Sequence, residues 1–297
     1  MGSSISKKIV RLGYILYGLV LTISLLYLRF PSNAFCEYFQ TSFNKIFPDC
    51  SLSIDHISIS PPFGLKFVNS QISDCLGNKW KLIMDKFYLF PETVSLIHGD
   101  YKCDFSAYMY GGSLGGRIDF PKQTKGSLYT VELAIKDLNI AENSILSDVA
   151  GHHMEGVLSG DIHLSLKDGN FQEGTGNGII NISDGYFDLR KPFMGLESVY
   201  FKSLRIEMVL NNMSLNLNGL ELRSEEMLAE ASGNVLLNKN FSLSNLNLKG
   251  SFEPYSDLLK SIMSSNVAKV SFKERLKEGK IPFIIQGTIR DPRIKFI

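Results

Sequence analysis

The chain has 297 residues, and its 31 Lys and Arg against 30 Asp and Glu leave a net charge of +1, which excludes a broad basic surface for nucleic acid. With 44% hydrophobic and 21% charged residues, it is too apolar for a disordered chain and long enough for one or two domains. Its 25 Gly and 20 Phe, with one Trp, stand in short alternating runs that favour strands and turns over a helical bundle. We therefore expect an all-β protein.

The first predicted element is a membrane-spanning helix. Residues 12–28 form a run of 17 residues without a charge, which is at the short end for a spanning helix. Three basic residues, Lys7, Lys8 and Arg11, precede the run and predict a cytoplasmic N-terminus, because positively charged flanks stay on that side. The rest of the chain is then expected outside the cytoplasm.

A cleaved signal peptide is the alternative, because Ser32-Asn33-Ala34 offers a small-x-small cleavage site after a basic start and an apolar stretch. The apolar run is longer than is usual in signal peptides, and this favours an uncleaved anchor. We expect a cytoplasmic stub and anchor at residues 1–30, a linker at 31–48 and a β-rich domain at 49–297, within which composition marks no further boundary.

Four cysteines, Cys36, Cys50, Cys75 and Cys103, lie beyond the predicted anchor. An even number of cysteines in an oxidising compartment permits disulfides. Three pairings are possible, and Cys36 with Cys50 plus Cys75 with Cys103 closes the shortest loops. Buried free thiols are the other interpretation, and the sequence does not choose between the two.

Beyond Pro48 apolar and polar residues alternate with a period of two, which is typical of strands with one buried face. In the first run the apolar phase changes at Asp55-His56, between Ile54 and Ile57, and this predicts a bulge. Further runs are bounded by Gly, Pro, Asn or Asp, at residues 65–68, 80–90, 102–110, 117–120, 128–138, 157–166, 178–182, 186–189, 199–210, 213–217, 228–237, 241–252 and 281–289. We expect a mainly antiparallel meander.

Two short helical segments are predicted to interrupt the strands. The first covers residues 139–149, because Asn139 and Glu142 form a capping pattern and Gly151 follows the apolar stripe. The second covers residues 255–263, with a further turn at 271–279. Both are expected to cover the sheet and not to form domains of their own.

One sequence pattern suggests catalysis, but its context does not support it. Residues 111–115 match the G-x-S-x-G string of a nucleophile elbow centred on Ser113, which requires a strand before the serine and a helix after it. The residues after Ser113 alternate like a strand and end at Pro121, so the string predicts a glycine-rich hairpin.

The other polar patterns predict no metal, cofactor or acid–base site. His152 and His153 are adjacent and therefore point in different directions, and His56, His98 and His163 share no ligand spacing with them. Gly174, Gly176 and Gly178 recur on one face of a predicted strand, which indicates close packing or a bend. Glu225-Glu226 fits a solvated turn. We expect no catalytic residue and no cofactor.

The tail from Ile281 to Ile294 reads I-P-F-I-I-Q-G-T-I-R-D-P-R-I. It resembles the closing P-F-x-x-x-G-T-x-x-x-P signature of the general secretion pathway protein N family. The basic N-terminal segment, Pro61-Pro62-Phe63-Gly64-Leu65, Tyr110-Gly111-Gly112 and Gly156-Val157-Leu158-Ser159-Gly160 agree with it in order, so the resemblance covers nearly the whole chain.

The resemblance implies a non-catalytic accessory component of type II protein secretion, anchored in the inner membrane with its bulk in the periplasm. Its partners would be secretion-machinery proteins of the inner membrane or periplasm. The family's body is similar to AsmA-type domains, which implies an elongated curved sheet or half-barrel. These relatives also suggest an alternative function, the binding or transfer of phospholipid in the cell envelope.

In the lipid-binding alternative, one apolar side of the sheet forms an open groove. The candidate lining residues are spaced two apart within their strands: Ile162, Leu164, Leu166, Ile206, Met208, Leu210, Leu215, Leu217 and Leu243. An ordinary sandwich core has the same alternation, so the sequence leaves both interpretations open.

Overall fold

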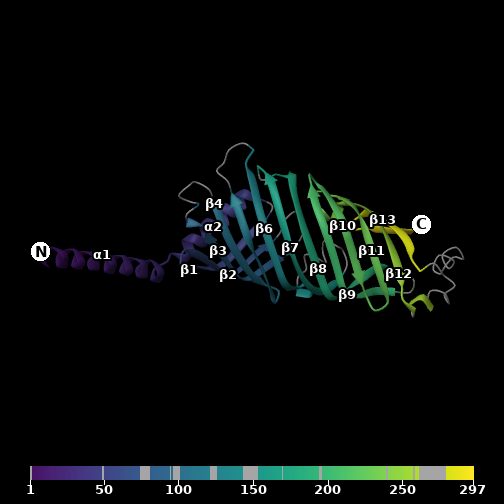
Figure 1. The fold of residues 1–297 in the computed structure, drawn as a ribbon, viewed down its shortest axis with the longest axis horizontal. Coiled ribbons are helices and arrows are strands. Elements are labelled where there is room, and N and C mark those ends of the chain that lie inside the picture. The colour runs from purple at the N-terminus through teal and green to yellow at the C-terminus, as the bar shows by residue number, and fades with distance from the viewer. Residues whose placement is uncertain are drawn as a thin grey trace.

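The computed structural model describes residues 2–297 except 49, 74–80, 94, 96–100, 121–125, 143–152, 169, 194–195, 239, 257 and 261–278. The described strands form a single 14-stranded sheet in which each strand pairs antiparallel with its neighbours in the chain. Figure 1 shows the strands succeeding one another along the long axis, with the two termini at opposite ends. The predicted antiparallel meander is confirmed.

The strand positions follow the period-two runs closely. The bounds are β1 Ser51–Ser60, β2 Gly64–Ser73, β3 Lys81–Pro91, β4 Tyr101–Met109, β5 Gly112–Phe120, β6 Leu128–Asn139, β7 Met154–Lys167, β8 Asn170–Phe193, β9 Leu196–Asn211, β10 Ser214–Arg223, β11 Met227–Leu236, β12 Asn245–Pro254, β13 Ile281–Thr288 and β14 Pro292–Phe296. Two runs predicted separately, 178–182 and 186–189, belong to the single long strand β8. Strand β14 was not predicted.

The phase change in β1 is present, but it is not a bulge. Ile54 and Ile57 are both buried, although they are three positions apart. The pairing of β1 with β2 keeps one register on both sides of Asp55, so no residue is inserted. Instead Asn69, opposite Asp55, has a left-handed backbone with φ of 49° and donates a hydrogen bond from its amide to the Asp55 carboxylate at 3.1 Å. The buried side of β1 therefore changes from even-numbered to odd-numbered residues without a shift in register.

Helix α1 (Gly2–Leu28) projects away from the sheet (Figure 1) and leaves apolar side chains exposed, such as Leu12, Leu16 and Leu28. Among the described residues, no helix combines the length and the apolar character needed to cross a membrane. The described residues do not bear out the transmembrane helix predicted over residues 12–28.

The segment predicted as a linker, residues 31–48, contains helix α2 (Ser32–Ile46). Cys36 and Phe39 lie one turn apart on the side of α2 that packs against Ile54, Ile57 and Phe67. The rings of Phe39 and Phe67 meet edge to face with centroids 5.1 Å apart. Helix α2 therefore covers the apolar side of the first strands.

The two predicted helical interruptions are only partly described. The first begins as η2 (Ile140–Glu142), where Asn139 donates from its side-chain amide to the Glu142 carboxylate at 3.1 Å; residues 143–152 lie outside the described part. In the second, Leu259 N–H donates to the Tyr255 carbonyl at 2.8 Å, which forms one helical turn. The rest of that segment and most of the predicted turn at 271–279 lie outside the described residues.

The cysteines do not form the disulfide pairing that would close the shortest loops, Cys36 with Cys50 plus Cys75 with Cys103. Cys36 and Cys103 are free thiols, whereas Cys50 is disulfide-bonded. Because Cys36 and Cys103 are free, neither the pair Cys36–Cys50 nor the pair Cys75–Cys103 forms. Burial raises the pKa of the Cys103 thiol, and the nearby carboxylates of Asp104 and Asp119 add to this. Cys75 lies outside the described residues.

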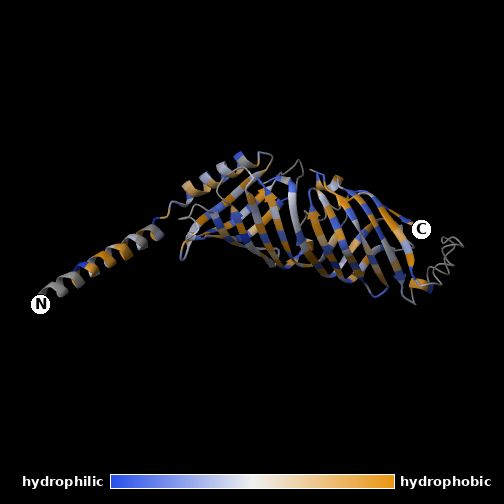
Figure 2. Ribbon diagram, turned by 45° about the horizontal axis from the view of Figure 1, so that its top comes forward, coloured by the Kyte–Doolittle hydropathy of each residue, from blue (hydrophilic) through white to orange (hydrophobic). Residues whose placement is uncertain are grey.

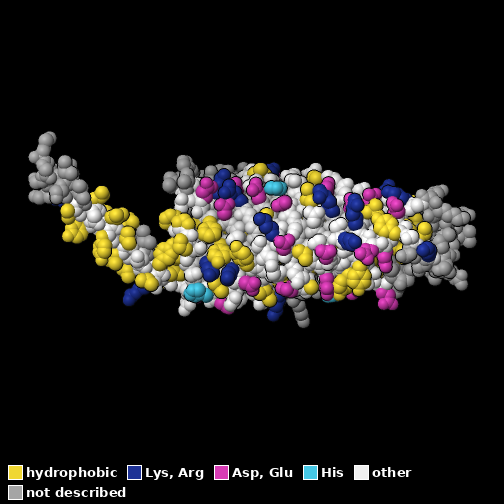
Figure 3. All heavy atoms as spheres, turned by 60° about the horizontal axis from the view of Figure 1, so that its bottom comes forward, with side chains coloured by type: hydrophobic (Ala, Val, Ile, Leu, Met, Phe, Trp, Pro, Cys, Tyr) yellow, Lys and Arg dark blue, Asp and Glu magenta, His cyan; other side chains and the backbone are white. Residues whose placement is uncertain are grey.

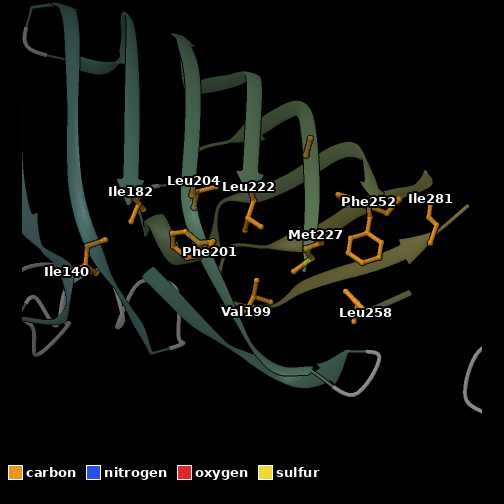
Figure 4. Close-up of a cluster of buried hydrophobic side chains, with 12 residues drawn as sticks. Ile140, Ile182, Val199, Phe201, Leu204, Leu222, Met227, Phe252, Leu258 and Ile281 are labelled. Atoms are coloured by element: carbon orange, nitrogen blue, oxygen red, sulfur yellow. The ribbon is translucent and has the colours of Figure 1, made fainter. Parts of the chain in front are cut away.

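The main core lies within the curve of the C-terminal half of the sheet. Figure 4 shows side chains from β8 to β13 that point toward one another, with Ile140 and Leu258 contributed by the segments beside the sheet. Ile281 is fully buried there, and Phe252 is 4% exposed. These residues define the main core: Ile140, Ile182, Val199, Phe201, Leu204, Leu222, Met227, Ala231, Phe252, Leu258, Ile281 and Phe283.

Candidate functional site

One face of the sheet is apolar along its entire length. The register connects one residue from each strand into a row that crosses the sheet at right angles to the strands. Every member is aliphatic, aromatic or glycine: Ile59, Leu65, Leu89, Phe105, Gly116, Leu133, Ile162, Gly178, Met208, Leu217, Gly233, Leu248, Ile285 and Ile294. We call this side the apolar face.

The opposite side, the polar face, carries hydrogen-bonding and charged side chains in the same register. From β4 to β14, one row across it has a single apolar member, Val209, and its next member, in β3, is Phe90. The row is Asp104, Arg117, Glu132, His163, Asn177, Val209, Asn216, Asn234, Asn247, Gln286 and Arg293. Figure 2 shows the resulting alternation of hydropathy along the strands, and in Figure 3 the visible surface carries scattered charges of both signs. The two faces therefore differ sharply in their affinity for water.

Eight of the nine predicted lining residues lie on the apolar face. Met208 pairs with Leu217, and Leu210 pairs with Leu215, so β9 and β10 present one continuous patch. The three β7 residues are separated from that patch by β8, which places Gly174, Gly176 and Gly178 opposite Leu166, Leu164 and Ile162. A Cβ at Gly176 would overlap the His163 carbonyl oxygen, so these glycines serve close strand packing.

The ninth residue, Leu243, was assigned wrongly. It lies in the short helix η3 (Phe241–Leu243), ahead of β12, and 46% of its surface is exposed. The predicted strand 241–252 begins only at Asn245, because Leu243 N–H donates to the Asn240 carbonyl and Ser244 N–H to the Phe241 carbonyl. These turn bonds take Leu243 out of the sheet.

Apolar-face residues on β5 and β6 were missed as lining candidates. Ile118 pairs with Val131, and Val131 pairs with Leu164 of β7. Their signal was present in the sequence, because Val131, Leu133 and Ile135 recur at every second position as the chosen residues do. Sequence alone did not show that these strands continue the same face.

The serine string lies in a tight hairpin, as predicted. Met109 pairs with Gly112 across a turn of Tyr110 and Gly111, both of which have positive φ, at 49° and 73°, as hairpin turns of this length require. Ser113 follows in β5, on the polar face opposite Tyr108. A strand and not a helix follows the serine, so the elbow geometry is missing.

The structure does not bring the described histidines together. His56 contacts the Ser32 hydroxyl at 3.0 Å, His153 contacts the Glu155 carboxylate at 3.1 Å, and His163 lies 4.0 Å from the Glu132 carboxylate. In the part of the chain that is described, no group of three or more His, Cys, Asp or Glu side chains could hold a metal ion. His98 and His152 lie outside that part.

The predicted acidic turn joins β10 to β11. The Ser224 hydroxyl accepts hydrogen bonds from the backbone N–H groups of Glu226 and Met227, each at 2.9 Å. This closes the turn and leaves Glu225 and Glu226 exposed. The Glu225 carboxylate forms an exposed ion pair with Lys202 at 3.2 Å, as expected for a solvated turn.

A small electrostatic effect lies on the polar face, where the Arg117 guanidinium donates to both Asp104 oxygens at 2.7 and 3.2 Å. These hydrogen bonds hold the pKa of Asp104 below its usual value. The pair's contribution to stability is therefore present above the unfolded-state pKa of about 3.9 and is lost as the pH falls through the lower folded-state pKa. Because both side chains are about half exposed, the contribution is small. We expect Arg117→Ala to raise the pKa of Asp104 in an NMR titration of its carboxyl carbon; an unchanged value would contradict the assignment.

The fold and this face define a class of protein: a single antiparallel sheet, apolar on one side and polar on the other, with a helix over its first strands. No protein-family model matches the chain, and no similar protein was found among curated proteins or among solved structures. The particular family is therefore not assigned by comparison.

Proposed function

We propose that the protein binds the acyl chains of phospholipids on its apolar face and serves as a lipid-binding or lipid-transfer protein of the cell envelope. The observation that carries this is the row of fourteen apolar or glycine residues that crosses the whole sheet. A contiguous apolar surface of this kind marks a binding site or an interface. Acyl chains suit it because their association needs only apolar contact.

The proposal involves no catalysis. The row across the apolar face contains no nucleophile and no titratable side chain, whereas acid–base chemistry needs such a group within hydrogen-bond reach of the reacting atom. The charged side chains of the same strands project from the other face, and the hydroxyl groups of Tyr101 and Tyr129 lie near the strand ends. A bound lipid would therefore be held and released unchanged, without a cofactor.

The accessory role in type II secretion, with secretion-machinery subunits as partners, depends on the sequence resemblance alone. The closing signature of that resemblance lies in the last hairpin, β13 with β14, and no side chain of that hairpin adds an observation in favour of a protein partner. We retain this role as an outcome of the test below. The periplasmic location is likewise part of the proposal.

The test compares two isoleucines on opposite faces of neighbouring strands. Ile162 lies on the apolar face of β7, and Ile179 lies on the polar face of β8, where it is 39% exposed. We expect the purified full chain to yield phospholipid on solvent extraction and mass spectrometry. Ile162→Asp should reduce the amount several-fold, because a carboxylate on this face would lose its hydration beside an acyl chain.

Ile179→Asp is the matched control and should retain the wild-type amount of lipid. Circular dichroism should show the same strand content in both variants. Absence of lipid from the wild-type chain, together with co-purification of defined secretion-machinery subunits, would replace the lipid proposal by the accessory role.

A further inference from the structure

The apolar face is filled by the protein itself at both ends. At the N-terminal end, Cys36 and Phe39 of α2 pack against Ile57 and Phe67. In β9–β13 the side chains pack on one another: Leu217, Val235 and Leu248 are 9%, 3% and 4% exposed and form one cluster. A ligand at either end would have to displace well-packed side chains, which is unfavourable.

Between these ends, Phe105, Ala107 and Met109 of β4 are buried, whereas the apolar side chains of β5–β7 are not. Six of them are half-buried, and none belongs to a buried cluster of the described residues. They are direct neighbours by register, since Ile118 pairs with Val131 and Val131 with Leu164, while Leu133 pairs with Ile162. We call them the β5–β7 patch: Ile118, Val131, Leu133, Ile162, Leu164 and Leu166.

Aromatic side chains border this patch at the ends of the strands. Tyr101 pairs with Phe120, and the Phe120 and Tyr129 rings meet edge to face with centroids 5.8 Å apart. Tyr101 is 55% and Phe120 41% exposed. We call these three residues the aromatic rim. The order from aliphatic patch to aromatic rim to solvent is the order found where proteins pass from hydrocarbon to lipid headgroups.

The chemistry of the patch favours a hydrocarbon chain over an extended peptide. The backbone N–H and C=O groups of β5–β7 are engaged in the strand ladder, and the six side chains carry no donor or acceptor. An extended peptide lying on the patch would bury its own backbone polar groups without partners, which is unfavourable. An acyl chain has no such groups.

We propose that the β5–β7 patch holds the acyl chains of one phospholipid, with the aromatic rim at the level of its headgroup. This inference rests on the proposed function and specifies its site. The patch extends about 13 Å along the strands and about 10 Å across them, a width that accommodates two acyl chains side by side and not those of a second lipid. The protein is then a carrier of one lipid and not a conduit along the length of the sheet.

The test uses two valines in one row of the apolar face. Successive pairs connect Val131 of β6 to Val235 of β11 through Leu164, Gly176, Leu210 and Leu215. Val131 is half-buried in the open patch, whereas Val235 is 3% exposed in a packed cluster. Val131→Phe should fill the patch, reduce bound phospholipid several-fold and leave the Tm unchanged. Val235→Phe should lower the Tm by several degrees and retain the lipid.

A second measurement locates the lipid directly. The full chain is incubated with phosphatidylcholine and phosphatidylglycerol vesicles in which one acyl chain carries a diazirine; after illumination, the adducts are mapped by peptide mass spectrometry. We expect adducts on β5–β7 and none on Leu217 or Leu248. Adducts mainly on β9–β13, or full lipid binding by Val131→Phe, would overturn the location alone. A wild-type chain that binds no lipid would overturn the proposed function as well.

Discussion

Phe252→Ala is expected to cost about 3–5 kcal/mol of unfolding free energy, the range measured when a buried phenylalanine is truncated and its neighbours cannot close the cavity. Phe252 is 4% exposed in the main core. It pairs with Ala229 on one side and Ile281 on the other, and its ring lies close to Leu258 (Figure 4). Because neighbours on both adjacent strands are fixed by the ladder, little collapse into the cavity is expected.

The control for this prediction is Phe241→Ala. Phe241 lies in η3 and is 46% exposed, so its truncation should cost less than about 1 kcal/mol. Urea unfolding of the full chain, followed by circular dichroism, measures both variants. Similar losses at the two positions would mean that the interior of the curved sheet is not a packed core.

The strands were predictable from sequence because each has one solvent-exposed side and one buried side. The alternation of polar and apolar residues therefore indicates the environment of each position. Helix α2 was not predicted, because period-two alternation does not reveal a helix. The stripe of Cys36, Phe39 and Phe43 on the helix has a different spacing. Its spacing of three and four residues was nevertheless visible in the sequence. The helix buries the apolar side of the first strands, which would otherwise be exposed to water.

The site was predictable only in part, because alternation does not specify which strands are neighbours. Ile162 and Met208 were predicted as lining residues of one apolar side of the sheet. The register places both on the apolar face, on either side of Gly178. What sequence could not reveal is packing: Leu217 is buried in a cluster, whereas Leu164 is half-buried outside any cluster. The difference arises from how tightly the sheet curves, which depends on all strands together.

The second large effect is expected at Gly116, on the apolar face of β5. A Cβ built there would overlap the Glu132 carbonyl oxygen of β6 and would lie 3.1 Å from the Phe105 ring. The backbone of β6 cannot move aside without breaking its own ladder, so the strain cannot be relieved by rotating a side chain. We expect Gly116→Ala to lower the free energy of unfolding by about 3 kcal/mol, at the upper end for overpacking.

The neighbouring Gly115 provides the matched control, since it lies on the opposite face of the same strand. The nearest atom to a Cβ there is the Phe105 carbonyl oxygen at 3.6 Å, which is an ordinary contact. Gly115→Ala should therefore stabilise the protein by about 0.4–1 kcal/mol, because alanine restricts the unfolded chain without straining the folded one. Opposite signs at adjacent glycines, measured by urea unfolding, would show that the close approach of β6 and Phe105 limits the space at Gly116, beside the β5–β7 patch. Equal effects would contradict that close approach.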